Sequence, residues 1–173
     1  MSEPAARDPR ALQVFVFRLE GERTVLLAEL GRVPGVEARL EAVDAHLEAA
    51  IAALGEAGVA YPAHAVAHRY GFSEGDYLLL QLGLLPWHGP EAVRRATTAL
   101  GEAAAQARVS HAAALLVPGA DDWRAVRRQI ATLPIVVERL VSLAPIEGED
   151  AGDAVIVVGQ ALRELLGLDE IAA

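Results

Sequence analysis

Residues 61–85 read YPAHAVAHRYGFSEGDYLLLQLGLL, a pattern that predicts two helices joined by a tight turn. The first helix is expected over residues 63–70, because the run stops at Gly71, the residue type that most readily adopts the left-handed conformation closing a helix. Ser73 is expected to cap the second helix, since its hydroxyl can accept a free backbone N–H of the first turn. Asp76 can reach back to the Ser73 N–H and complete a variant of the capping box.

The second helix is expected to be buried, because it is apolar on nearly every side. Its large apolar residues are Tyr77, Leu78, Leu79, Leu80, Leu82, Leu84 and Leu85. A helix that reads DNA bases needs Arg, Lys, Asn or Gln at its exposed N-terminal end, where this one carries Glu74 and Asp76. Phosphates would repel both carboxylates, so we interpret the helix-turn-helix shape as structural.

The remaining patterns predict a mainly α fold with a small β component. The expected further helices cover about residues 36–55, 91–107 and 110–117, a helix after an Asp121 or Asp122 cap, and residues 160–166. Residues 135–143 and 154–158 are β-rich runs on either side of an acidic connection, and they predict a hairpin. We therefore expect a winged-helix-like helical domain over residues 36–173, with this hairpin as its wing.

Residues 1–35 are expected to hold a polar tail and a possible β-hairpin. Two apolar runs, residues 12–19 and 24–30, flank a short Glu-Gly-Glu sequence. A hairpin is favoured because Phe15, Phe17 and Leu19 would share one strand face. A helix is the alternative, since Leu12, Phe15, Val16 and Leu19 also have helical spacing.

Composition excludes several classes of chemistry. The 173 residues contain no Cys, and all 15 basic residues are Arg, so a thiol nucleophile, a phosphate-loop lysine and a Schiff-base lysine are excluded. With a formal net charge of −9, nucleic-acid binding is disfavoured and basic protein partners are favoured. The sequence shows no apolar run long enough to span a membrane and no signal-type N-terminus, which predicts a soluble cytoplasmic protein.

Several blocks resemble one known family. Residues 68–80, HRYGFSEGDYLLL, are similar to the ARRFGLSPFERDLLLL block in the N-terminal winged-helix domain of a group of large bacterial AAA+ ATPases. Similar blocks follow in the same order at residues 109–116, 134–143 and 165–170. The resemblance covers about residues 60–173. The ATPase module itself, with its phosphate loop and lysine, is missing, which suggests an excised domain or a stand-alone relative without ATP hydrolysis.

The resemblance implies a non-catalytic protein-interaction or regulatory domain that recruits a substrate or partner, possibly an ATPase module in the same chain or complex. The acidic connection offers a possible partner-binding site made of Glu147, Glu149, Asp150 and Asp153. A winged-helix DNA-binding transcription regulator is the alternative. The acidic connection opposes it, because a wing that contacts DNA normally presents Arg or Lys to phosphate.

The third hypothesis is a small metal-dependent enzyme in which His64 and His68 bind the metal ion. Their spacing matches the two metal-binding histidines of a His-Glu-x-x-His motif, but Ala65 stands where the general base would be, and a third ligand such as His88 would be needed. Ser110 and His111 do not suggest a nucleophile and base, because adjacent helical residues point about 100° apart. We therefore expect no catalytic residue, cofactor or metal.

Overall fold

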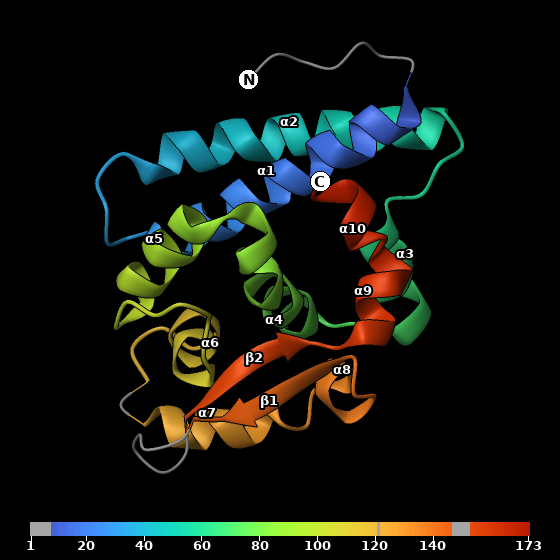
Figure 1. Cartoon of the computed structure of the whole chain (residues 1–173). Coiled ribbons are helices and arrows are strands. Elements are labelled where there is room, and N and C mark those ends of the chain that lie inside the picture. The colour runs from blue at the N-terminus through green and yellow to red at the C-terminus, as the bar shows by residue number, and fades with distance from the viewer. Residues whose placement is uncertain (1–7, 121, 147–152) are drawn as a thin grey trace.

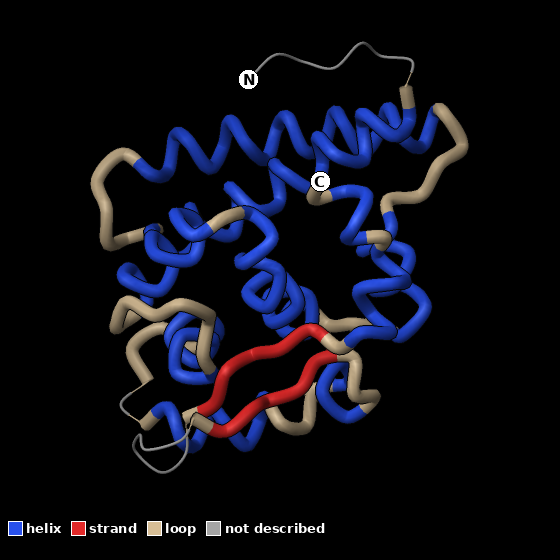
Figure 2. Tube along the Cα trace, viewed as in Figure 1, coloured by secondary structure: helices blue, strands red, loops and turns tan. Residues whose placement is uncertain are grey.

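Helices dominate the computed structural model of the chain, which describes residues 8–120, 122–146 and 153–173 (Figure 1). In this part of the chain the strands form one antiparallel two-stranded hairpin near the C-terminal end (Figure 2). The helices are α1 (Pro9–Glu29), α2 (Val36–Glu56), α3 (Pro62–Tyr70), α4 (Glu74–Leu84), α5 (Pro90–Leu100), α6 (Val109–Leu116), α7 (Trp123–Ile130), α8 (Pro134–Val137), α9 (Gln160–Leu166) and α10 (Leu168–Ile171), with a 3-10 turn η1 (Leu85–His88). None of the described helices is both long and apolar enough to cross a membrane.

The hairpin predicted for residues 12–30 is wrong, because this segment is the long helix α1. Asp8 caps the helix by accepting a hydrogen bond from Arg10 N at 3.0 Å. Helix α1 packs against α2, α4 and α5, so it is buried on several sides and lacks the clean one-sided pattern of a surface helix. The Glu-Gly-Glu sequence that suggested a turn lies in the middle of this helix, with Glu20 buried.

Helix α2 confirms the amphipathic prediction and pairs with α1 as a helical hairpin (Figure 1). Two ion pairs join the helices, Arg23 with Asp44 and Arg39 with Glu22, each at 2.7 Å. Most of the outward side of α2 is exposed to solvent.

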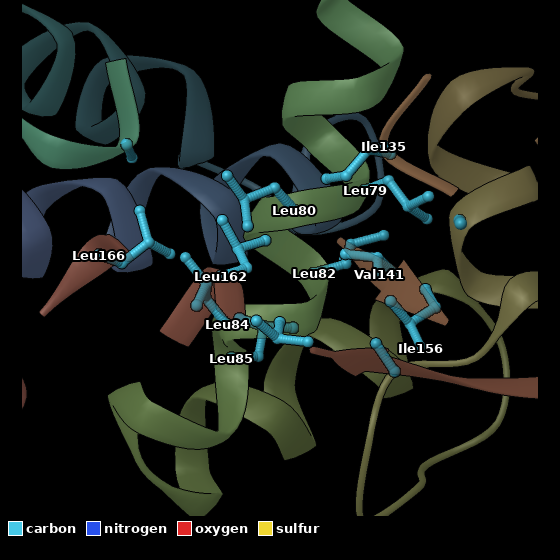
Figure 3. Packing of buried hydrophobic residues seen from close by; sticks show 14 of the residues in the cluster. Leu79, Leu80, Leu82, Leu84, Leu85, Ile135, Val141, Ile156, Leu162 and Leu166 are labelled. Atoms are coloured by element: carbon cyan, nitrogen blue, oxygen red, sulfur yellow. The ribbon is translucent and has the colours of Figure 1, made fainter. Parts of the chain in front are cut away.

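The predicted pair of helices over residues 63–85 is confirmed as α3 and α4. Gly71 ends α3 in the left-handed conformation, with φ of 63°. Ser73 and Asp76 form the expected capping box, in which Asp76 N donates to Ser73 Oγ at 3.2 Å and Ser73 N donates to Asp76 Oδ2 at 2.8 Å. Helix α4 runs through the centre of the core, where its leucines meet residues of α8, α9 and both strands (Figure 3).

The C-terminal hairpin pairs β1 (Val141–Pro145) with β2 (Ala154–Val158), and β2 has the predicted bounds. The predicted first strand began too early, because residues 134–137 form α8 instead of a strand. Pro134 fits the first turn of this short helix, since its fixed φ is helical and its missing N–H is not needed there. Helix α5 is also shorter than predicted, since it ends before Gly101.

Candidate functional site

Most of the acidic connection proposed as a partner-binding site, namely Glu147, Glu149 and Asp150, lies outside the described residues. Asp153 is described, and its carboxylate accepts hydrogen bonds from Ser110 N at 3.1 Å and from Ser110 Oγ at 2.7 Å. These bonds tie the start of β2 to the first turn of α6. The role of the acidic connection in partner binding stays a prediction.

The histidines considered as metal ligands do not meet at one point. His64 Nε2 lies 3.1 Å from Glu20 Oε1, whereas His68 is exposed and the His88 ring stacks on Phe17, with 4.1 Å between ring centroids. Among the described residues, no group of three His, Asp or Glu side chains is arranged to hold a metal ion.

Ser110 and His111 have separate structural partners. Ser110 bonds to Asp153, as above, while the buried His111 accepts a hydrogen bond from Arg108 N at 3.0 Å through Nδ1. His111 Nε2 lies 2.8 Å from the Glu102 carbonyl oxygen. Burial lowers the pKa of His111, so the imidazole is neutral at pH 7 and suited to this capping role.

A buried polar cluster around Glu20 is the most distinctive chemical feature of the described residues. The Glu20 side chain is only 4% exposed, yet it lies in the middle of α1 among apolar residues. Tyr77 Oη donates to Glu20 Oε1 at 2.5 Å, and Gln81 Nε2 donates to Glu20 Oε2 at 3.0 Å. With His64, three helices therefore supply the cluster: α1 the carboxylate, α3 the histidine, and α4 the phenol and the amide.

The two tyrosines near Glu20 are neutral at physiological pH. Burial, followed by the nearby Glu20 carboxylate, raises the pKa of Tyr77 and of Tyr61 above the ordinary value for a phenol. Tyr77 thus keeps its proton and serves as a hydrogen-bond donor to the carboxylate. Its ring also lies beside His64, with 5.6 Å between ring centroids.

The Glu20 cluster forms part of the lining of a cavity of about 420 Å³ bounded by α1, α2, α3 and α4. We call it the α1–α4 cavity. Its apolar lining comes from Leu47 and Ile51 of α2 and Leu78 of α4. Its polar lining consists of Glu20, Arg23, Thr24, Asp44, Glu48, His64, Tyr77 and Gln81.

Gln81 lines the α1–α4 cavity and carries an unpaired acceptor beneath its surface. The residue is 4% exposed, and its Oε1 atom is buried without a hydrogen-bond partner among the described residues. The amide orientation follows from its neighbour, because only Nε2 can donate to the Glu20 carboxylate. Buried acceptors of this kind are uncommon, and Gln81 Oε1 has almost no accessible surface, so it does not face the open space of the cavity.

A second cavity, of about 560 Å³, lies on another side of α1 and is lined by His88, Phe17, Gly21 and the C-terminal residues. Burial lowers the pKa of His88 to about 4, so its ring is neutral at pH 7. His88 Nε2 is buried without a partner among the described residues.

The sequence patterns do not predict the Glu20 cluster. The available signals were a Glu inside the apolar run of residues 12–30 and a Gln inside the Leu-rich run of α4. Comparison of the chain with protein-family models, with curated proteins and with solved structures gives no match.

Proposed function

We propose that the chain is a non-catalytic protein-interaction or regulatory domain of the winged-helix type, which recruits a substrate or partner protein. The family resemblance of residues 60–173 supports this function, and an ATPase module in the same chain or complex is the first candidate partner. The acidic connection between β1 and β2 is the proposed contact surface, because its carboxylates offer a complement to a basic partner.

The observation that carries the winged-helix proposal is the order of elements after α4. Helix α5 is followed by an isolated bridge that pairs Arg108 with Val155, then by α6 and α7, and then by the β1–β2 hairpin. A helix, a short strand, a helical pair and a hairpin in this order are the parts of a winged helix. In this assignment α7 takes the position of the second helix of the helical pair, and the buried helix α4 packs against α6, the first helix of the pair.

A DNA-binding regulator is the second candidate, and one observation favours it. Helix α7 carries Arg127, Arg128 and Gln129, residue types that can contact phosphates and base edges. Against it stand the net charge of −9 and the four carboxylates of the proposed wing, which phosphates would repel. Electrostatics therefore favours a protein partner over duplex DNA.

The test is the association rate of the chain with a purified partner, identified by affinity capture and then titrated by surface plasmon resonance. Reversing Glu149 and Asp150 to Arg is expected to slow association about ten-fold, because charges at an interface rim act mainly on the encounter rate. The matched control reverses Glu37 and Glu41, which are exposed on α2, to Arg. Equal rates for the two double variants, or no saturable binding by any purified candidate, would contradict the proposal.

A further inference from the structure

We infer that the second cavity, of about 560 Å³, is a binding site for a small organic acid, an apolar molecule that carries one carboxylate. We call it the α1–α5 cavity, because α1 and α5 line it together with η1 and the C-terminal residues. This site is separate from the acidic connection. Three features of the cavity support it, namely an arginine without a partner, the balance of charge in the lining, and the apolar side chains beside them.

Arg18 of α1 is exposed and lines the α1–α5 cavity. Among the described residues it forms no hydrogen bond or ion pair, also not with Ala173, the last residue of the sequence and another part of the lining. The acid one helical turn away, Glu22, has other partners, because it accepts from Arg39 at 2.7 Å and lies 3.5 Å from Arg95. A guanidinium group offers five N–H donors in a planar fork that matches a carboxylate. Arg18 therefore has donors available for a carboxylate in the cavity.

The charges around the α1–α5 cavity favour an anion over a cation. Arg18 and Glu22 are the charged side chains of the lining, and the two arginines that contact Glu22 compensate its negative charge. His88 adds no charge at pH 7, because burial lowers its pKa to about 4. The positive charge of Arg18 is therefore the one that the described residues leave without a counterion.

The first turn of α5 adds to this preference. Ala92 of this turn lines the cavity, and no side chain caps the free N–H groups at the start of the helix. Glu91 in the same turn is engaged by Arg94, at 2.6 Å. The N-terminal end of a helix carries a partial positive charge, so it attracts an anion to the same space as Arg18.

The apolar lining gives the occupant its second property. Phe17 and Val25 come from α1, Trp87 from η1 and Ile171 from α10, so hydrocarbon placed among them is removed from water. Trp87 is half-buried, which leaves part of its indole accessible to an occupant. The volume of about 560 Å³ falls in the range that holds small organic molecules, roughly 300–1,000 Å³.

The test is a fluorescence titration of the full chain with Trp123→Phe, which leaves Trp87 as the only tryptophan, at about 0.15 M salt. Three probes share a phenyl ring and a three-carbon chain, namely phenylpropionate, phenylpropanol and phenylpropylammonium. Phenylpropionate is expected to change the Trp87 emission with a saturable curve and to bind about ten-fold more tightly than phenylpropanol, because it gains a charge-assisted hydrogen bond. Phenylpropylammonium is expected not to bind. Equal affinities for the three probes, or no saturable change with phenylpropionate, would overturn the inference.

Two pairs of variants locate the binding. Arg18→Gln removes the charge from an exposed position, so the preference for phenylpropionate over phenylpropanol is expected to fall about ten-fold, whereas Arg10→Gln, on α1 outside the lining, is expected to leave it unchanged. Ala92→Phe fills part of the cavity and is expected to weaken phenylpropionate binding at least about ten-fold. Thr98→Phe, exposed on α5 outside the lining, is its control. A preference that survives Arg18→Gln would contradict the assignment, even if Ala92→Phe does not fold.

The C-terminal residue of another protein has the same chemistry, and a fourth probe separates the two sources. Acetylated phenylalanine carries the same phenyl ring and carboxylate on a peptide unit. We expect phenylpropionate to bind more tightly, because the added amide would lose water in a mainly apolar lining. Tighter binding of acetylated phenylalanine would overturn the small-molecule assignment and indicate a peptide C-terminus as the occupant.

Discussion

Asp76 joins the start of α4 to the start of α8, because its Oδ1 atom accepts a hydrogen bond from Ile135 N at 2.9 Å. The other carboxylate oxygen, Oδ2, accepts from Ser73 N at 2.8 Å and from Ser73 Oγ at 2.5 Å. The residue has no exposed surface, so one carboxylate satisfies backbone groups from two segments that are 59 residues apart. The cap of α4 is thereby also a tertiary contact.

We expect Asp76→Ala to cost about 2–4 kcal/mol, because it removes the cap and leaves the buried Ile135 N–H without an acceptor. Ser73→Ala should cost only about 1 kcal/mol, since Asp76 can still bond to Ile135 N. Urea unfolding of both variants measures the difference. Equal losses would show that the bond to Ile135 contributes nothing.

Replacing Leu79 by Asp should cost several kcal/mol, because the side chain is fully buried and the new charge would have no partner (Figure 3). Leu165→Asp on α9 is the matched control, since Leu165 is 44% exposed and should tolerate the charge within about 0.5 kcal/mol. Thermal unfolding compares the two variants. An unchanged melting temperature for Leu79→Asp would place α4 at the surface.

Two glycines in long helices should respond to alanine in opposite directions. A Cβ atom on Gly21 would lie 2.3 Å from His88 Nδ1 and 2.5 Å from His88 Cγ, so Gly21→Ala should destabilise by about 1–3 kcal/mol through overpacking. A Cβ atom on Gly55 of α2 meets no atom within 4 Å, so Gly55→Ala should stabilise by about 0.5–1 kcal/mol. If both substitutions stabilise the fold, α1 and His88 are not in close contact.

The stability of the folded chain should fall as the pH is lowered from about 6.5 to about 4, in part because of His88. Burial lowers the pKa of His88 from 6.5 to about 4, so in this range the unfolded chain binds a proton that the folded chain does not. The contribution is on the order of 3 kcal/mol, since one pKa unit corresponds to about 1.4 kcal/mol. Below about pH 4 both states are protonated and the contribution stops changing.

Urea unfolding of wild type and His88→Phe between pH 4 and 7 measures this contribution, because Phe removes the titrating group and can still stack on Phe17. The wild type should lose more stability than the variant as the pH falls. If the free energy of unfolding changes with pH to the same extent in both proteins, His88 is not buried in its neutral form.

Features set by neighbouring residues could be predicted from the sequence. The Gly71 helix end and the Ser73–Asp76 capping box depend on residues within four positions of each other, and both are found as expected. Helix α1 is not predictable in this way, because it packs against several other helices and apolar residues on several of its sides obscure the helical period. The spacing of apolar residues therefore does not distinguish a strand from a helix over residues 12–30.

The Glu20 cluster could not be predicted in the same way. Its members come from three helices, and His64 and Gln81 are 44 and 61 residues from Glu20 along the chain. No one of these residues by itself predicts a polar cluster. Their meeting depends on how α1, α3 and α4 pack, which local patterns do not encode.

We propose that the chain binds protein and not DNA, and titration with a DNA duplex at about 0.15 M salt tests this proposal. At this salt the screening length is about 8 Å, so carboxylates close to phosphates are only partly screened. We predict no binding tighter than about 10⁻⁴ M, the weak end of non-specific affinity, for any duplex selected from a random pool. Sub-micromolar, sequence-selective binding that is lost in an Arg127→Ala and Arg128→Ala double variant would contradict this proposal and establish α7 as a DNA-reading helix.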